Sequence, residues 1–137
     1  MPEIRRLALG GFTNEVAAGR GFTRAALTDW GWTDTNQHLS GRPEATDDVL
    51  LVVSELLSNA SRHAGGTLVL EARRLTARSV RVEVFDRSST LPTPSSPDYA
   101  GQTGGYGLRI VHRLSTRWGV TLRRASPGKS VWAELSR

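Results

Sequence analysis

The sequence contains no cysteine and only three histidines, and these shortages exclude several kinds of site. Without cysteine the chain forms no disulfide bonds and offers no thiolate as nucleophile or metal ligand. His38, His63 and His112 are scattered along the chain without the spacing of a zinc site. Disulfide scaffolds, thiol chemistry and cysteine-based zinc sites are therefore excluded.

Long apolar runs are also missing. No run of 18 or more apolar residues occurs, and 38% of residues are apolar and 23% charged, so we expect a soluble globular protein with no membrane partner. The first residues, MPEIRRLALGG, lack the long apolar stretch of a secretory signal, which predicts a cytoplasmic location. A length of 137 residues suits one domain, residues 1–137, with its own core.

Lysine is nearly absent, because 17 arginines accompany one lysine, Lys129, in a chain of net charge +5. The arginines are spread from Arg5 to Arg137 without one dense basic helix, a pattern more typical of codon bias in a GC-rich genome than of phosphate contacts. We therefore expect no nucleic-acid partner. A nucleic-acid binder driven by charge stays as a lesser hypothesis, and it predicts an affinity that collapses with added salt.

The most informative stretch is residues 48–66, DVLLVVSELLSNASRHAGG. Its apolar residues recur at helical spacing and predict one broad buried face. Glu55, Asn59, Arg62 and His63 stand at i, i+4, i+7 and i+8, so they share another side of the same helix. A carboxylate and a carboxamide one turn apart, both hard oxygen donors, suit Mg²⁺ and a phosphate-bearing ligand. The alternative is a solvated helix face.

The remaining patterns predict an α+β fold, a two-layer α/β sandwich whose mostly antiparallel, mixed sheet has helices packed on one face. In residues 79–86 alternation is strict, with Val80, Val82 and Val84 on one side. Gly19 and Gly21 weaken the first helix locally. We expect strands at 4–9, 67–74, 79–86, 119–124 and 130–136, two hairpins among them, and helices at about 14–30, 43–64 and 108–118.

Two further features follow the second strand of the first hairpin. Asp86 ends that strand, either as a buried carboxylate at the sheet end or as a turn or capping residue. Residues 87–104 are rich in proline and hydroxyl groups, and a loop of that length is a functional lid or a disordered insertion. The glycine run 104–107 then leads into a helix, an arrangement that exposes backbone N–H groups to phosphate.

In this order the features resemble the GHKL superfamily of histidine kinase-like ATPases, which have the Bergerat ATP-binding fold. The resemblance is closest to its compact branch, the anti-sigma-factor serine/threonine kinases. It covers essentially the whole chain and implies a single ATPase domain with an ATP lid at about residues 87–105. The segments that carry it are VVSELLSNASRHA (52–64), similar to the asparagine box; VEVFDRS (82–88), similar to the first nucleotide box; GGYGLRIV (104–111), similar to the glycine box; and GKSVWAEL (128–135), similar to the closing strand.

The resemblance implies ATP and Mg²⁺ as ligands and gives roles to two residues of the helix. Asn59 is expected to ligate Mg²⁺ that bridges the triphosphate. Glu55 is expected to polarise the attacking hydroxyl or water as a general base. His63 either lies near the ligand or makes a structural hydrogen bond to the backbone.

The other implied binding residues lie on the strands and the glycine run. Asp86 is expected to accept a hydrogen bond from the adenine amino group, and Ser130 to assist it through water. Gly105 and Gly107 are expected to let backbone amides approach the phosphates, and Leu108 is counted with them as a nucleotide-binding residue.

The implied function is an ATP-binding anti-sigma factor that phosphorylates a serine or threonine of an anti-anti-sigma-type protein and holds a sigma factor when free of that partner. Kinases of this branch often carry a basic residue beside the lid glycines, whereas Thr103 and Tyr106 stand here. The alternative is therefore a catalytically silent module that binds ATP and regulates by sequestering a protein partner. A homodimer is common in the branch, and aromatic residues near the N-terminus are either its contact or core: Phe12, Phe22, Trp30 and Trp32.

Overall fold

The computed structural model describes residues 3–32, 44–63, 67–87, 103–122 and 128–137. Among the described residues no helix is both long and apolar enough to cross a membrane. These residues form, in chain order, β1 (Ile4–Ala8), α1 (Glu15–Asp29), α2 (Ala45–His63), β2 (Thr67–Thr76), β3 (Ser79–Asp86), α3 (Thr103–Leu114), β4 (Arg117–Leu122) and β5 (Lys129–Ser136).

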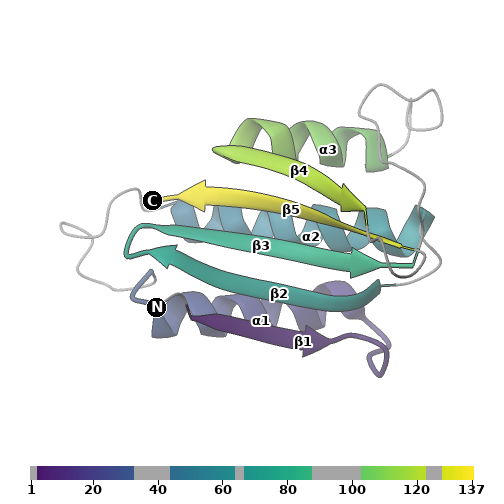
Figure 1. Ribbon diagram of the computed structural model, residues 1–137, viewed down its shortest axis with the longest axis horizontal. Helices are drawn as coiled ribbons and strands as arrows, with labels where there is room; N and C mark the ends of the chain where they lie inside the picture. The colour runs from purple at the N-terminus through teal and green to yellow at the C-terminus, as the bar shows by residue number, and fades with distance from the viewer. Residues whose placement is uncertain (1–2, 33–43, 64–66, 88–102, 123–127) are drawn as a thin grey trace.

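The five strands form one sheet in the order β1-β2-β3-β5-β4, and each pairing is antiparallel. Two hairpins, β2-β3 and β4-β5, are joined along β3 and β5 in a register that runs from Ser79↔Ser136 to Asp86↔Lys129. All three helices lie behind the sheet in Figure 1, and its other side faces the viewer. The predicted two-layer α+β fold is confirmed, and the sheet is antiparallel throughout the described strands rather than mixed.

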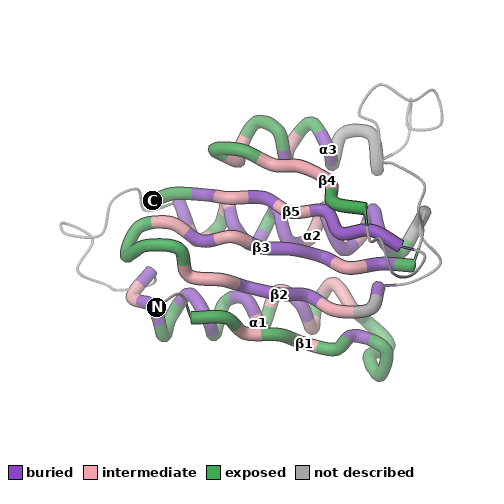
Figure 2. Tube along the Cα trace, viewed as in Figure 1, coloured by how far each residue is buried: buried purple, intermediate pink, exposed green. Residues whose placement is uncertain are grey.

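The core lies between the sheet and α2. Val80, Val82 and Val84 on β3 point toward the helices, where they meet the buried partners that β5 supplies at the same register. Figure 2 shows β3 and β5 as the most continuously buried strands of the sheet. The predicted alternation of residues 79–86 is therefore confirmed, because one face of the strand is packed against helices.

Helix α1 is continuous despite its glycines. It begins at Asn14, whose side-chain oxygen accepts a hydrogen bond from the Ala17 N–H at 3.0 Å. A Cβ added at Gly19 would overlap Leu57 Cδ1, so glycine lets α1 approach α2 closely. Gly19 and Gly21 are expected to weaken this helix because glycine has low helix propensity. Packing of α1 against α2 outweighs that propensity here. Trp30 and Trp32 belong to the core, whereas Phe12 is exposed and Phe22 is partly buried against the core.

The prediction of a helix over 108–118 is wrong at both ends. Helix α3 begins at Thr103, so it includes the glycine run, and it ends at Leu114. Beyond it the Thr116 N–H donates to the Glu134 carbonyl at 2.8 Å, and Trp118 pairs with Ala133 on the helix-facing side of the sheet. Residues 117 and 118, whose spacing also fits a helix, therefore belong to β4 because they pair with β5. Of the lid predicted at about 87–105, residues 88–102 lie outside the described residues and 103–105 open α3.

Candidate functional site

Several helices and strands begin or end at one edge of the molecule (Figure 1). There α2 ends, β2 begins, β3 ends, α3 begins and β5 begins, on the right of Figure 1. The register supports this arrangement, because Asp86 at the end of β3 is opposite Thr67 on β2 and opposite Lys129 on β5. Only residues 64–66 separate the end of α2 from Thr67, a span of roughly 14 Å at most. Residues singled out on α2, β3 and β5 therefore lie at the same end.

A compact polar group, the Asp86 cluster, consists of Thr67, Asp86 and Lys129. Lys129 Nζ lies 3.0 Å from Asp86 Oδ1, and the two side chains are only 5% and 1% exposed. The Thr67 hydroxyl is also buried and has no hydrogen-bond partner within the described part of the chain. The Asp86 cluster is therefore a desolvated polar site. Asp86 is thus a buried carboxylate at the end of the sheet, which favours that interpretation over a turn or capping residue.

The pleat of the sheet explains why Asp86 and Lys129 meet, and a register shift between Thr67 and Val69 places Thr67 opposite Asp86. Residues opposite one another on antiparallel strands point to the same side, and side chains alternate along each strand. Asp86 and Lys129 follow Val84 and Val131 by two positions toward the site, so they continue the helix-facing row of the core. A buried ion pair at the end of an apolar row gains little stability, because desolvation offsets most of its Coulomb attraction. Stability alone is therefore a weak explanation for the pair.

Asn59 lies on α2, one helical turn before the end of that helix. It is 7% exposed, and its Oδ1 atom is buried without a hydrogen-bond partner among the described residues. A buried carbonyl oxygen without a partner costs about 1–3 kcal/mol, so the folded chain carries a penalty that a ligand could remove. Glu55 lies one turn earlier and is partly exposed. A solvated helix face does not describe Asn59; the side chains of Arg62 and His63 lie outside the described residues.

The Asn59 amide fits Mg²⁺. An amide oxygen is a hard ligand, and Mg²⁺ is usually held by one or two protein oxygens together with phosphates and water. No group of three or more histidine and acidic side chains that could hold a metal occurs among the described residues. A cation held by the Asn59 oxygen would take further ligands from water or from phosphate oxygens.

The glycine run and Leu108 open α3. Gly105 lies in the first turn of α3, where backbone N–H groups point out of the helix start and the helix dipole is positive, whereas the N–H of Gly107, in the second turn, is at the position that bonds to the Thr103 carbonyl within the helix. Leu108 is fully buried but lies outside the main hydrophobic cluster. The start of α3 thus supplies a positive helix end to the same edge of the molecule.

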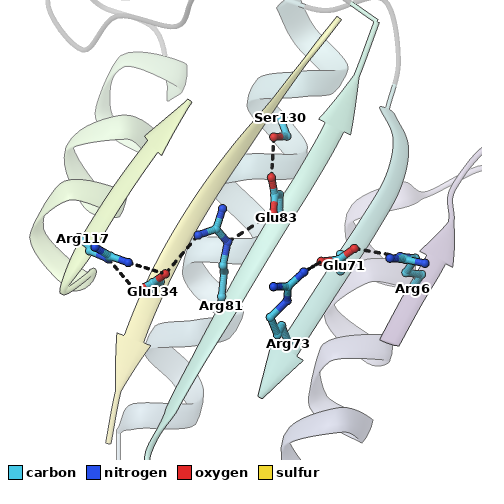
Figure 3. Close-up of polar contacts among 8 residues, drawn as sticks. All are labelled: Arg6, Glu71, Arg73, Arg81, Glu83, Arg117, Ser130 and Glu134. Atoms are coloured by element: carbon cyan, nitrogen blue, oxygen red, sulfur yellow. Dashed lines mark hydrogen bonds and ion pairs between the residues drawn. The ribbon is translucent and has the colours of Figure 1, made fainter. Parts of the chain in front are cut away.

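Ser130 is not brought to Asp86. It is opposite Phe85, one position away from the Asp86↔Lys129 pair, so it points to the other side of the sheet. There its hydroxyl donates to Glu83 Oε2 at 2.5 Å, as Figure 3 shows. The expected assistance of Ser130 to Asp86 does not fit this placement, and Lys129 occupies that position. The alternation of side chains along β5 could have predicted this placement from the sequence. Lys129 stands two, four and six positions before the core residues Val131, Ala133 and Leu135, so it points to the same side of the sheet as they do.

The sheet side away from the helices carries a network of arginines and glutamates, drawn in Figure 3. Glu71 is held by Arg6 and Arg73 at 2.9 and 3.2 Å. Glu134 accepts from Arg81 and from Arg117, and the Arg117 hydrogen bond is the main reason that the pKa of Glu134 lies below its ordinary value. Each of these arginines is engaged with a carboxylate.

The comparison with family models agrees with this geometry. The model of the histidine kinase-like ATPase domain matches residues 13–135, which is nearly the whole chain. No curated protein matched the sequence.

Proposed function

Because the chain belongs to the histidine kinase-like ATPase family, we propose that it is an ATP-dependent regulatory kinase of the anti-sigma type. Domains of this family generally bind ATP with Mg²⁺. The finer proposal is that the chain transfers the γ-phosphoryl group to a serine or threonine of an anti-anti-sigma-type protein. When that partner is absent, the chain holds a sigma factor. The likeness of four sequence segments to the compact branch supports this choice within the family.

At the base end, the Asp86 carboxylate accepts a hydrogen bond from the adenine amino group. Burial supports this role, because a carboxylate removed from water gives a charge-assisted hydrogen bond that water does not replace. Guanine presents a carbonyl oxygen at the position of the adenine amino group, so the same carboxylate would repel it. Thr67 borders Asp86 on β2 and has a hydroxyl to direct toward a base or a bound water.

At the phosphate end, Asn59 Oδ1 and the start of α3 hold the triphosphate. Mg²⁺, when bound, would neutralise charge on the phosphate oxygens. Glu55 lies one turn from Asn59 on the same helix, at a spacing that lets it orient and deprotonate an attacking hydroxyl. Most of the catalysis would come from positioning, because phosphoryl transfer needs little covalent chemistry from the protein.

The observation that carries the proposal is the buried Asn59 oxygen without a partner among the described residues. Calorimetric titration of ATP with Mg²⁺ into the wild type and into Asn59→Ala tests it. We expect saturable binding by the wild type and at least tenfold weaker binding by the variant, since a hydrogen bond or ligand contact to a charged group contributes about 1.5–3 kcal/mol. Absence of nucleotide binding by the wild type would refute the proposal at its first step.

The silent module is the second candidate, favoured by Thr103 and Tyr106 where a basic residue is usual in the branch. Incubation with γ-labelled ATP and a protein that copurifies from the native cell separates the two candidates. A kinase labels a serine or threonine of that protein, and Glu55→Gln loses the label while it keeps ATP affinity. A silent module binds ATP and retains its partner, but leaves it unlabelled.

A further inference from the structure

Lys129 is the only lysine in a chain that has arginine at its 17 other basic positions. Its side chain is also buried, 5% exposed, whereas the side chains of the arginines paired on the other side of the sheet are 23–69% exposed. Lysine differs from arginine in having a compact ammonium with three rotatable donors instead of a planar fork. The one lysine thus places a compact cation with rotatable donors at a buried position beside a carboxylate.

The position of Lys129 is inside the proposed base pocket. Its Nζ donates to Asp86 Oδ1 at 3.0 Å from the neighbouring strand, on the helix-facing side. Two apolar residues at these positions would continue the row of Val84 and Val131 and would avoid the desolvation of two charges. A role in stability alone therefore gives no reason for the pair, whereas a ligand with matched polar groups does.

We propose that Lys129 is a specificity-determining residue that reads the ring nitrogen N1 of adenine. The edge of adenine presents a donor, the 6-amino group, directly beside an acceptor, N1. The Asp86–Lys129 pair presents an acceptor beside a donor, which is the complementary order. Lys129 shares its N–H donors between Asp86 and N1 while Asp86 accepts from the amino group. This inference rests on the proposed function, since it assigns the second contact of the same ATP pocket.

The experiment compares ATP with 1-deaza-ATP, in which a carbon replaces N1 and the 6-amino group is kept. Affinities of the full chain are measured with Mg²⁺ by calorimetry. For the wild type we expect 1-deaza-ATP to bind about tenfold or more weakly, since a charge-assisted hydrogen bond is lost. In Lys129→Met the two nucleotides should bind within about twofold of each other. Arg81→Met is the matched control, because it removes one paired cation from the other side of the sheet and should keep the wild-type ratio.

Lys129→Met leaves Asp86 without its buried cation, so its folding is checked first by circular dichroism and thermal unfolding. Lys129→Gln is the second variant, because its amide keeps a neutral donor next to Asp86. For Lys129→Gln we expect a ratio of affinities between those of the wild type and Lys129→Met. Lys129→Arg should weaken binding of both nucleotides, since its larger fork does not fit a space shaped for an ammonium.

The outcomes separate this inference from the proposed function. A wild type that binds no ATP overturns both. If the wild type binds ATP, and folded Lys129→Gln and Lys129→Met both keep the wild-type ratio of ATP to 1-deaza-ATP affinity, the proposed role of Lys129 is overturned while the proposed function stands. GTP binding tighter than ATP would overturn the assignment of N1, because the ammonium would then be reading the guanine carbonyl.

Discussion

Asn59→Ala should separate folding from ligand binding at the proposed phosphate end of the site. In the folded chain the Asn59 oxygen is buried without a partner among the described residues, and its removal should return about 1–3 kcal/mol of desolvation cost. Truncation to alanine leaves a small cavity that costs roughly 1 kcal/mol. The free energy of unfolding without ligand should therefore be unchanged or rise by up to about 2 kcal/mol.

The assay is urea unfolding with and without Mg²⁺ and ATP. Ligand at one hundred times its dissociation constant for the wild type should stabilise the wild type by about 2.7 kcal/mol, and at the same ligand concentration Asn59→Ala by about 1.4 kcal/mol or less, because its binding is at least tenfold weaker. Asn14→Ala is a matched control, because this asparagine has a partner: its side chain caps α1 at 3.0 Å from the Ala17 nitrogen. We expect Asn14→Ala to lose about 1 kcal/mol of stability and to keep the full ligand effect.

One pattern would refute this reasoning. If Asn59→Ala lost more than about 2 kcal/mol without ligand and were still stabilised by Mg²⁺ and ATP as strongly as the wild type, the amide would be a structural group. The buried oxygen would then have no connection with nucleotide.

The remaining predictions concern packing, pH and the sheet side away from the helices. Gly19→Ala should lower the free energy of unfolding by about 1–3 kcal/mol, because the added methyl group overlaps a buried leucine. Gly21→Ala, at a position open to solvent in the same helix, should raise the free energy of unfolding by about 0.5–1 kcal/mol. Urea unfolding midpoints that shift in the same direction for both variants would contradict this. Because the pKa of Glu134 is lowered on folding, its contribution to stability is complete above its ordinary pKa of 4.5 and is lost as pH falls through the lower folded pKa. The stability difference between wild type and Glu134→Gln should accordingly shrink in acid titrations, and a difference that stays constant below pH 4.5 would count against it. Ser130→Ala should cost about 1.5–3 kcal/mol by removing a donor to Glu83, as measured by thermal unfolding; a loss of ATP affinity without loss of stability would restore the role in binding that its sequence position implies.

Much of the fold could be predicted because its patterns are local. The alternation of residues 79–86 and the apolar spacing of α2 each indicate which face is buried, and both are observed. The start of α3 could not be predicted from propensity, since glycines disfavour a helix interior by about 1 kcal/mol each. The end of α3 could not be predicted either. Trp118 fits the local helical pattern, and its pairing with Ala133 on β5 is not visible in the neighbouring sequence.

The candidate site was harder to predict at the level of single contacts. Asp86 and Asn59 carry recognisable neighbours along the sequence, and both prove to be buried. Which of Lys129 and Ser130 points toward Asp86 depends on the alternation of side chains along β5, because a shift of one residue moves a side chain to the opposite side of the sheet. The similarity to family segments does not determine which side each residue faces. The apolar residues at every second position after Lys129 do determine it.

The crossing of the chain between β3 and β5 has a consequence for the order of folding. Asp86 and Lys129 are neighbours in space but 43 positions apart along the chain, whereas each hairpin closes through a short connection. Closing a flexible segment of that length costs roughly 3 kcal/mol of chain entropy before β3 and β5 gain any contact. Local hairpins therefore have a kinetic lead over the central pairing. Asp86 and Lys129, the two halves of the proposed base pocket, lie on separate hairpins, so their pairing is expected to be among the last parts of the domain to form. A truncated or stalled chain that has only the first hairpin would present Asp86 without its cation.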